Sequence, residues 1–182
     1  PAVTLVGSIP TVTIGSGSGS NLNLSAQNKI GSVTVKADAQ GAIKVRQIEF
    51  TVSDSGFSSA PTIVNTTPGT SIFLALAGSQ TRITNSYCTI ASSTITCELG
   101  GSGNTDYAND FLIPANQQTT FDLYATVTGT AASGAKAAIS TSLTASTFLW
   151  DDTSTNGATG STGLTGTLIY GFPTGSYTIS QQ

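Results

Sequence analysis

Apolar and polar residues alternate with a period of two along most of the chain. In Thr119–Thr128 the residues on one face are Phe121, Leu123, Ala125 and Val127. A period of two is the spacing of a β-strand, in which successive side chains point to opposite faces. The same pattern predicts strands over 33–37, 43–52, 72–76, 81–84, 94–99, 111–113, 137–145, 148–150, 168–170 and 177–179.

Turn-forming residues separate these predicted strands, and no stretch has a convincing helical period. Examples are Asp54-Ser55-Gly56 and Pro173-Thr174-Gly175. Many short strands with turn signals roughly every ten residues are typical of a β-sandwich. We therefore predict an all-β fold, a single sandwich of the jelly-roll or Ig-like kind.

The alternation changes phase once, inside 43–52. Ile43 and Val45 share one parity, whereas Ile48 and Phe50 have the other. One extra residue in a strand restores the facing of both sets. The sequence therefore predicts a β-bulge near Arg46-Gln47.

The front of the chain is an extended apolar segment followed by Gly/Ser repeats. Residues 1–14 read as β-structure, and residues 15–20 alternate Gly and Ser. Six such residues span roughly 13 Å on average and about 20 Å when extended, so the first strand is able to reach a neighbour's sheet. This divides the chain into a donor-type strand (1–14), a flexible linker (15–20) and a sandwich body (21–182). The alternative is that residues 1–14 form the first strand of their own sandwich.

Charge is scarce, which excludes several classes of protein. Charged residues make up 8% of the 182 residues, against roughly 25% in an ordinary soluble protein. Six basic residues and a net charge of −3 provide no patch for nucleic acid, and no apolar run approaches the roughly 20 residues of a membrane span. The sequence starts at Pro1 and holds no Met, which favours a processed protein at the cell surface or outside the cell.

Two cysteines flank a predicted hairpin. A turn centred on residues 91–93 places Cys88 opposite Cys97, within reach of a disulfide. The alternative is a pair of reduced, buried thiols.

Catalytic motifs are absent from the sequence. With no His, neither a Ser-His-Asp nor a Cys-His nucleophile system is available. A glycosidase-like carboxylate pair is the remaining alternative, and its candidates are Glu49, Glu98, Asp122, Asp151 and Asp152. We expect no enzyme and no cofactor other than a structural calcium ion.

Calcium would be held by one of two acidic loops. Asp152, Ser154 and Asn156 offer oxygen ligands at alternate positions before Gly157, as in the first half of a calcium loop. The closing Glu of such a loop is missing, because Gly163 stands in its place. A second loop, residues 104–110, carries four amide or carboxylate groups. The alternative for both loops is a solvated turn.

Asn23-Leu24-Ser25 and Asn65-Thr66-Thr67 match the N-glycosylation sequon. Glycans at Asn23 and Asn65 would suit an extracellular protein whose surface carries little charge.

Parts of the chain resemble known surface proteins. The phrase IPANQQTTFDLYATV, residues 113–127, is similar to one that recurs in Ig-like surface proteins of bacteria. Residues 148–152 and 169–179 resemble the end of secreted, Ser/Thr-rich repeat domains. This resemblance implies a β-sandwich at the cell surface and no reaction.

We therefore expect a structural subunit that polymerises with copies of itself into a filament, tube or layer. In this hypothesis the N-terminal strand fills a groove in the next subunit, as in donor-strand filaments, and the contact residues are Val3, Leu5, Val12 and Ile14. The alternative is an adhesin or carbohydrate-binding module, with Tyr107, Trp150, Tyr170 and Tyr177 as candidate stacking residues.

Overall fold

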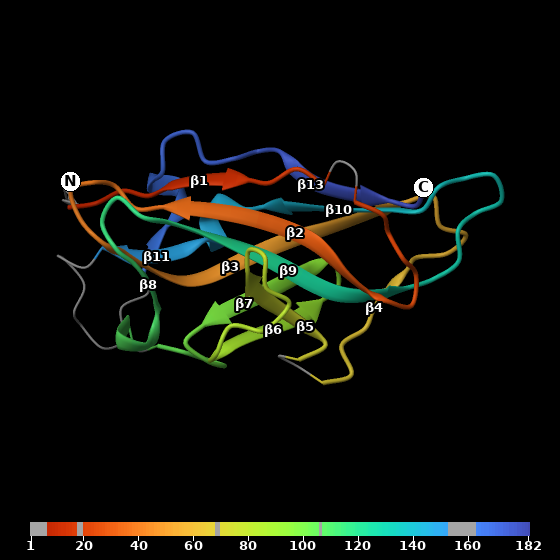
Figure 1. Cartoon of the computed structure of the whole chain (residues 1–182), viewed down its shortest axis with the longest axis horizontal. Helices are drawn as coiled ribbons and strands as arrows, with labels where there is room; N and C mark the ends of the chain where they lie inside the picture. Colours follow the sequence, from red (N-terminus) through yellow and green to blue (C-terminus); the bar gives the residue numbers. More distant parts are fainter. Residues whose placement is uncertain (1–6, 18–19, 68–69, 106, 153–162) are drawn as a thin grey trace.

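The computed structural model describes residues 7–17, 20–67, 70–105, 107–152 and 163–182. In these residues nearly all regular structure is β, which confirms the predicted class (Figure 1). The strands are β1 (Thr11–Ile14), β2 (Gln27–Lys36), β3 (Ile43–Ser55), β4 (Thr62–Ile63), β5 (Ile72–Leu76), β6 (Ser86–Ala91), β7 (Thr94–Leu99), β8 (Phe111–Ile113), β9 (Gln118–Thr128), β10 (Ala138–Leu143), β11 (Leu149–Asp152), β12 (Leu164–Thr165) and β13 (Ser176–Ser180). Three short 3-10 helices, η1 (Tyr107–Asn109), η2 (Ala145–Thr147) and η3 (Gly166–Leu168), lie between strands.

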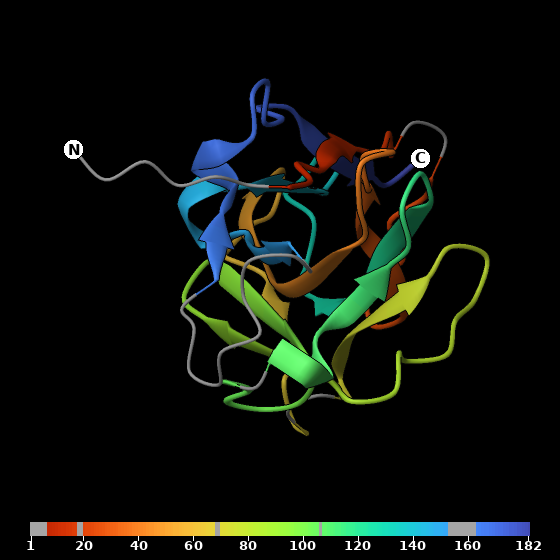
Figure 2. The ribbon, with the colours of Figure 1, turned by 90° about the vertical axis from the view of Figure 1, so that its left-hand side faces the viewer.

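The strands form two antiparallel sheets that face each other across one core (Figure 2). The first sheet has the order β1-β2-β9-β4, with β5 also paired to β9. The second has the order β12-β11-β3-β10-β13, and β7 and β8 pair with β3 while β6 pairs with β7. The inward residues of the long strands are buried, as the period-two pattern predicts.

The predicted bulge in β3 is confirmed. Leu149 and Trp150 are consecutive in β11, yet they pair with Gln47 and Val45, so Arg46 is the extra residue. The bulge keeps Val45 and Ile48 in the core although their parity differs.

Two expected strands take other forms. Residues 81–84 contribute one bridge, between Arg82 and Ala75, and one hydrogen bond from Ile83 N–H to the Leu74 carbonyl. In residues 168–170, Leu168 is the last residue of helix η3, and residues 169 and 170 lie in the bend and turn that follow.

Candidate assembly surface and buried charge cluster

The strand expected to leave the domain, β1, pairs with β2 of its own sheet. The register runs from Thr11 opposite Lys36 to Ile14 opposite Val33. Val12 is buried in the core and Ile14 packs against it, half-buried. Within the single chain, therefore, these two proposed contact residues serve their own sandwich. Val3 and Leu5 lie outside the described residues.

The outer edge of β1 borders a groove. Gly15 N–H donates to the Ser32 carbonyl, so the odd-numbered residues of β1 bond to β2 and the backbone groups of Val12 and Ile14 point away from it. A groove of about 380 Å³ lies between this edge and residues 171 and 173–176. It separates β1, at the edge of the first sheet, from β13, at the edge of the second.

The segment before β1 is held at one end of the sandwich. Gly7 N–H donates to a carboxylate oxygen of Asp152, the last residue of β11. The Ser8 hydroxyl donates to the Gly41 carbonyl over 2.9 Å, and Ser8 is buried. The chain therefore joins the sandwich at a defined place, beside the end of β11.

The described glycines of the Gly/Ser segment pack closely. A Cβ on Gly17 would lie 2.0 Å from the Thr178 carbonyl oxygen, and Gly17 is buried. Ser20 N–H donates to the Gly17 carbonyl, and Leu22 N–H donates to the Ser180 carbonyl. In the single chain these residues connect β1 to β2 across the edge of β13. The division into donor strand, linker and body stays a prediction.

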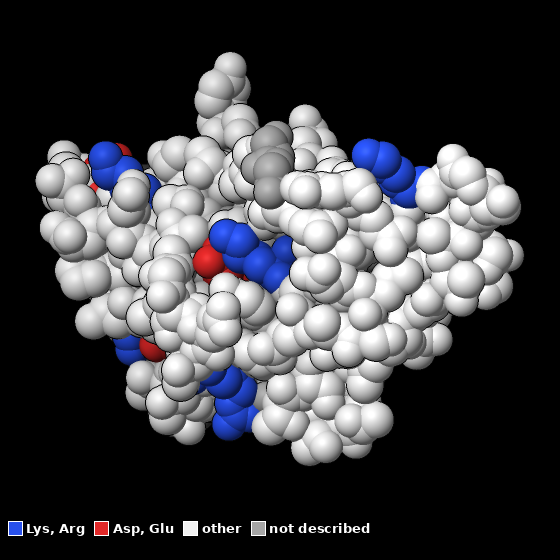
Figure 3. All heavy atoms as spheres, turned by 45° about the vertical axis from the view of Figure 1, so that its right-hand side comes forward, with Lys and Arg blue, Asp and Glu red and all other residues white. Residues whose placement is uncertain are grey.

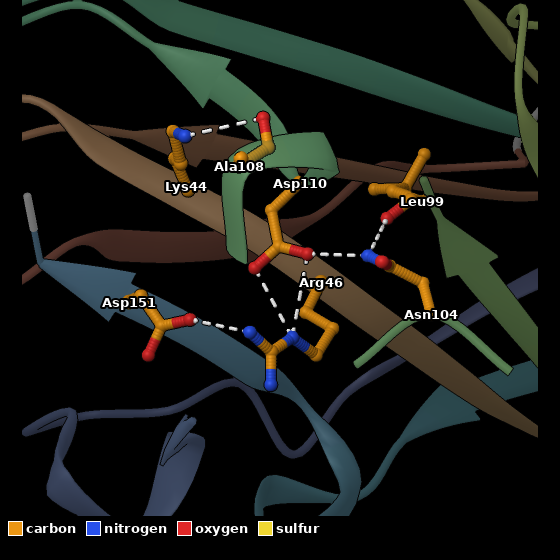
Figure 4. A network of polar contacts seen from close by, with 7 residues as sticks. All are labelled: Lys44, Arg46, Leu99, Asn104, Ala108, Asp110 and Asp151. Carbon is orange, nitrogen blue, oxygen red and sulfur yellow. Dashed lines mark hydrogen bonds and ion pairs between the residues drawn. The ribbon is translucent and has the colours of Figure 1, made fainter. Parts of the chain in front are cut away.

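A buried charge cluster forms around the bulged residue (Figure 4). Arg46 Nε lies 3.1 Å from Asp110 Oδ2, and Arg46 Nη2 lies 3.1 Å from Asp151 Oδ2. All three side chains are buried. Asn104 Nδ2 donates to Asp110 Oδ1 over 2.7 Å, and Lys44 Nζ donates to the Ala108 carbonyl over 3.4 Å. The cluster thereby joins β3, β11 and the loop that contains η1.

Burial raises the pKa of Asp110 to about 6, because desolvation disfavours its carboxylate more than the charge and hydrogen bond of Arg46 favour it. The neighbouring Asp151 also raises this pKa, since two carboxylates share one guanidinium. Arg46 is the residue that sequence reasoning missed. The signal available for it was the phase change at the bulge, because bulges re-aim side chains.

The first proposed calcium loop is only partly described. Asp152 is buried and its carboxylate accepts the Gly7 N–H, whereas Ser154 and Asn156 lie outside the described residues. In the second loop the Asn104 amide donates to Asp110 and to the Leu99 carbonyl. Within the described parts of the chain, no group of three or more acidic or Cys side chains is arranged to hold a metal ion.

The predicted disulfide is confirmed. Cys88 and Cys97 are bonded across the β6–β7 hairpin, with their Cα atoms 4.0 Å apart. The turn between the strands consists of Ser92 and Ser93, and Ser92 adopts a left-handed φ of 55°. A disulfide is typical of proteins that fold in an oxidising compartment.

The two sequons differ in exposure. Asn23 is exposed, and its side-chain oxygen accepts a hydrogen bond from Asn21. Asn65 is half-buried, and its side-chain oxygen is buried with no hydrogen-bond partner. Asn23 is thus the more accessible of the two positions for a glycan.

Of the candidate stacking residues whose side chains the structure describes, two are buried and one is exposed. Trp150 and Tyr177 are buried in the core, where neither presents a ring face to solvent. Tyr170 is fully exposed, with a relative exposure of 103%. The side chain of Tyr107 is not among the described ones.

Charges on the surface are sparse, as the composition predicts. On the face drawn in Figure 3, the Lys and Arg side chains lie as separate groups, some of them beside an acidic side chain, on a surface that is mostly uncharged. None of the described helices is long and apolar enough to cross a membrane.

Comparison with known proteins identifies no relative from which function can be transferred. No protein-family model matches the chain, and no curated protein matches its sequence. Among solved structures, the Actinomyces fimbrial adhesin FimA is similar with 11% identity and a TM-score of 0.36, over 93% of this chain and 54% of FimA. This chain thus spans about half the length of FimA. AvmM, which catalyses macrocyclization in alchivemycin A biosynthesis, is similar with 11% identity and a TM-score of 0.35, over 97% of this chain and 89% of AvmM. The fold itself defines the class, an all-β sandwich with one disulfide.

Proposed function

We propose that the protein is a structural subunit that assembles with copies of itself into an extracellular filament, tube or layer by donating its N-terminal residues. The observation that carries this proposal is the hydrogen bond from Gly7 N–H to the Asp152 carboxylate. This bond fixes the point, at one end of the sandwich, where residues 1–6 join the described chain. Those residues, 1–6, place Val3 and Leu5 at alternate positions. An extended segment with alternate apolar residues is what strand addition uses.

The packing of β1 in its own sheet limits the residues that are available for donation to those before β1. Val12 is buried in its own core, and its removal would leave a cavity and an open edge on β2. We therefore assign Val12 and Ile14 to anchoring the segment in its own subunit. In this proposal Val3 and Leu5 make the contact with the neighbour.

The disulfide and the low charge support an extracellular location and a surface that tolerates close subunit packing. Six basic and nine acidic residues create little repulsion between copies. Because donor and acceptor surfaces differ, the contact is heterologous, and its repetition produces an open assembly.

Negative-stain electron microscopy tests the proposal on the full chain and on a variant that lacks residues 1–6. We expect filaments or sheets from the full chain and dispersed particles from the truncation. Because β1 remains in place, the truncation should keep its melting temperature within a few degrees. A Leu5→Asp variant should behave like the truncation, because it places a charge in the apolar contact.

Thr4→Asp is the matched control, since Thr4 faces the other side of an extended segment from Leu5. It should assemble like the unaltered chain. Monodisperse monomers from the full chain, over a range of salt and calcium concentrations, would refute the proposal.

The second candidate is an adhesin or carbohydrate-binding module, and the exposed ring of Tyr170 is the observation that favours it. A glycan array with reproducible hits that disappear on Tyr170→Ala would support this function. Tyr177→Phe is the control, because Tyr177 is buried. If this variant keeps the same hits, binding depends on the exposed tyrosine and not on the buried one.

A further inference from the structure

A second groove opens at the end of the sandwich away from Gly7. It lies between β4 of the first sheet and the β6–β7 hairpin of the second, and its volume is about 240 Å³. Four strands each contribute one aliphatic residue to its lining: Val52, Ile63, Ile90 and Ile139. Ile139 is buried at its base, while the other three are half-buried. Aliphatic side chains from both sheets are therefore accessible in one place.

The groove also offers backbone hydrogen bonds. Val64 N–H donates to the Thr126 carbonyl, so the backbone groups of Thr62 and Val64 point toward β9. Ile63 lies between them, and its N–H and carbonyl point away from β9. In the described part of the chain, β4 pairs with β9 alone. An added strand would thus find both an apolar floor and the edge of a sheet.

This groove is out of reach of the chain's own N-terminal residues. Gly7 is bonded to Asp152, which pairs with Ile43 at the start of β3. The groove residue Asp54 stands near the end of the same strand, eleven residues further on. At about 3.3 Å per residue the two ends of β3 are roughly 36 Å apart. Six extended residues span at most about 22 Å.

The two ends are visible in Figure 1. β8 and β11 lie toward one end of the long axis, and β4 lies toward the other. A tail that starts at the first end of one copy can meet the groove of another copy placed in line with it. No such arrangement is available within one copy.

We propose that the groove between β4 and the β6–β7 hairpin is the acceptor site for residues 1–6 of a second copy of this chain. This inference rests on the proposed function and specifies where the donated segment binds. Val3 and Leu5 contact the half-buried side chains of Val52 and Ile90, which lie over the buried Ile139. The backbone of the segment extends the first sheet beside Ile63. Repetition along the long axis stacks subunits head to tail.

Complementation between two defective variants tests this site. The truncation without residues 1–6 keeps the groove but has no donor, and Ile63→Asp keeps the donor but has a charged groove. Each alone should remain monomeric up to concentrations at least about tenfold above the assembly threshold of the unaltered chain. Mixed, they should form a 1:1 dimer and nothing longer, because the donor of the Ile63→Asp copy fills the intact groove of the truncated copy. The truncated copy has no donor to pass on, and the groove of the Ile63→Asp copy is blocked.

The control variant is Leu168→Asp, which changes an exposed Leu in η3, outside the groove. It should assemble like the unaltered chain. Assembly of Ile63→Asp alone at the normal threshold would overturn the acceptor site. Thermal unfolding of each variant separates a blocked groove from a misfolded subunit.

Disulfide trapping keeps the proposal testable if Ile63→Asp fails to fold. Oxidation of the double variant Leu5→Cys, Ile63→Cys should produce a ladder of cross-linked copies on a denaturing gel. The double variant Leu5→Cys, Ile14→Cys probes the other groove, beside β1. If only the variant with Ile14→Cys forms a ladder, and the variant with Ile63→Cys forms none, the acceptor site is overturned. Strand donation itself would then remain supported. A full chain that never assembles and never cross-links would overturn both.

Discussion

At the scale of single residues, Arg46 shows how a backbone irregularity places a charge inside an apolar sandwich. In a regular strand, Arg46 would lie on the same face as Ile48 and Phe50, which are buried in the core. Placing its charge there would carry a high desolvation penalty. The bulge brings Arg46 between Asp110 and Asp151, where each carboxylate lies 3.1 Å from a guanidinium nitrogen. Movement of the loop that carries Asp110 would separate this carboxylate from Arg46 and leave a buried charge uncompensated. We therefore expect the cluster to restrain that loop.

The cluster makes stability depend on pH. The folded pKa of Asp110, about 6, lies above its ordinary value of 3.8. A carboxyl with a raised folded pKa binds more protons in the folded chain, so its stabilising contribution is fully present below about pH 4 and is lost as the pH rises through about 6. We therefore expect the free energy of unfolding of the unaltered chain, relative to that of Asp110→Asn, to decrease as the pH is raised from about 4 to about 6.

Urea unfolding at several pH values, with both proteins in the same buffers, measures this difference. Asp38→Asn, at an exposed turn, controls for the loss of one carboxylate. Parallel pH profiles for the unaltered chain and Asp110→Asn would contradict the assignment.

At the scale of elements, the connection from β1 to β2 depends on close backbone contact. Gly17 lies against the Thr178 carbonyl of β13, where a Cβ has no room. The alternation of Gly and Ser in this segment therefore has a packing role in the single chain, in addition to the flexibility for which such repeats are known.

We expect Gly17→Ala to destabilise the fold by about 1–3 kcal/mol, since the added methyl group forces β13 or the connection to shift. Gly175→Ala is the matched control, because no atom lies within 4 Å of the position of its Cβ. That control should change the free energy of unfolding by less than about 0.5 kcal/mol. Equal denaturation midpoints for the two variants would show that Gly17 has room for a side chain.

At the scale of the whole molecule, the proposed assembly joins apolar side chains and backbone groups with few charges nearby. The donated residues 1–6 carry no charged side chain, and the acceptor groove has one, Asp54. Electrostatic attraction between copies is therefore a minor contribution to their association, in contrast to assemblies held by rows of ion pairs.

Salt should consequently have little effect on assembly. We expect the threshold concentration to change by less than about twofold between about 0.05 M and about 1 M sodium chloride, because screening acts on charges that the contact lacks. Sodium sulfate should lower the threshold, since it favours apolar burial. Light scattering over a concentration series measures both effects, and steep dissolution in sodium chloride would contradict an apolar contact.

The sequence by itself determined the features that depend on neighbouring residues. Alternation along 119–128 predicted the inward face of β9, the phase change predicted the bulge of β3, and the spacing of Cys88 and Cys97 predicted the disulfide across one hairpin. Each of these signals is carried by residues close together in the chain, where strand periodicity and turn geometry act directly.

Tertiary structure decided what distant residues do together. The place of β1 beside β2, the pairing of Arg46 with Asp110 and Asp151, and the groove at Ile63 all depend on how the two sheets meet. Alternation records which side of a strand is apolar, but it is the same for a strand in its own sheet and for one added to a neighbour's. The choice between them rests on the reach of the chain and on which edges the folded sandwich leaves open, and both are properties of the packed molecule.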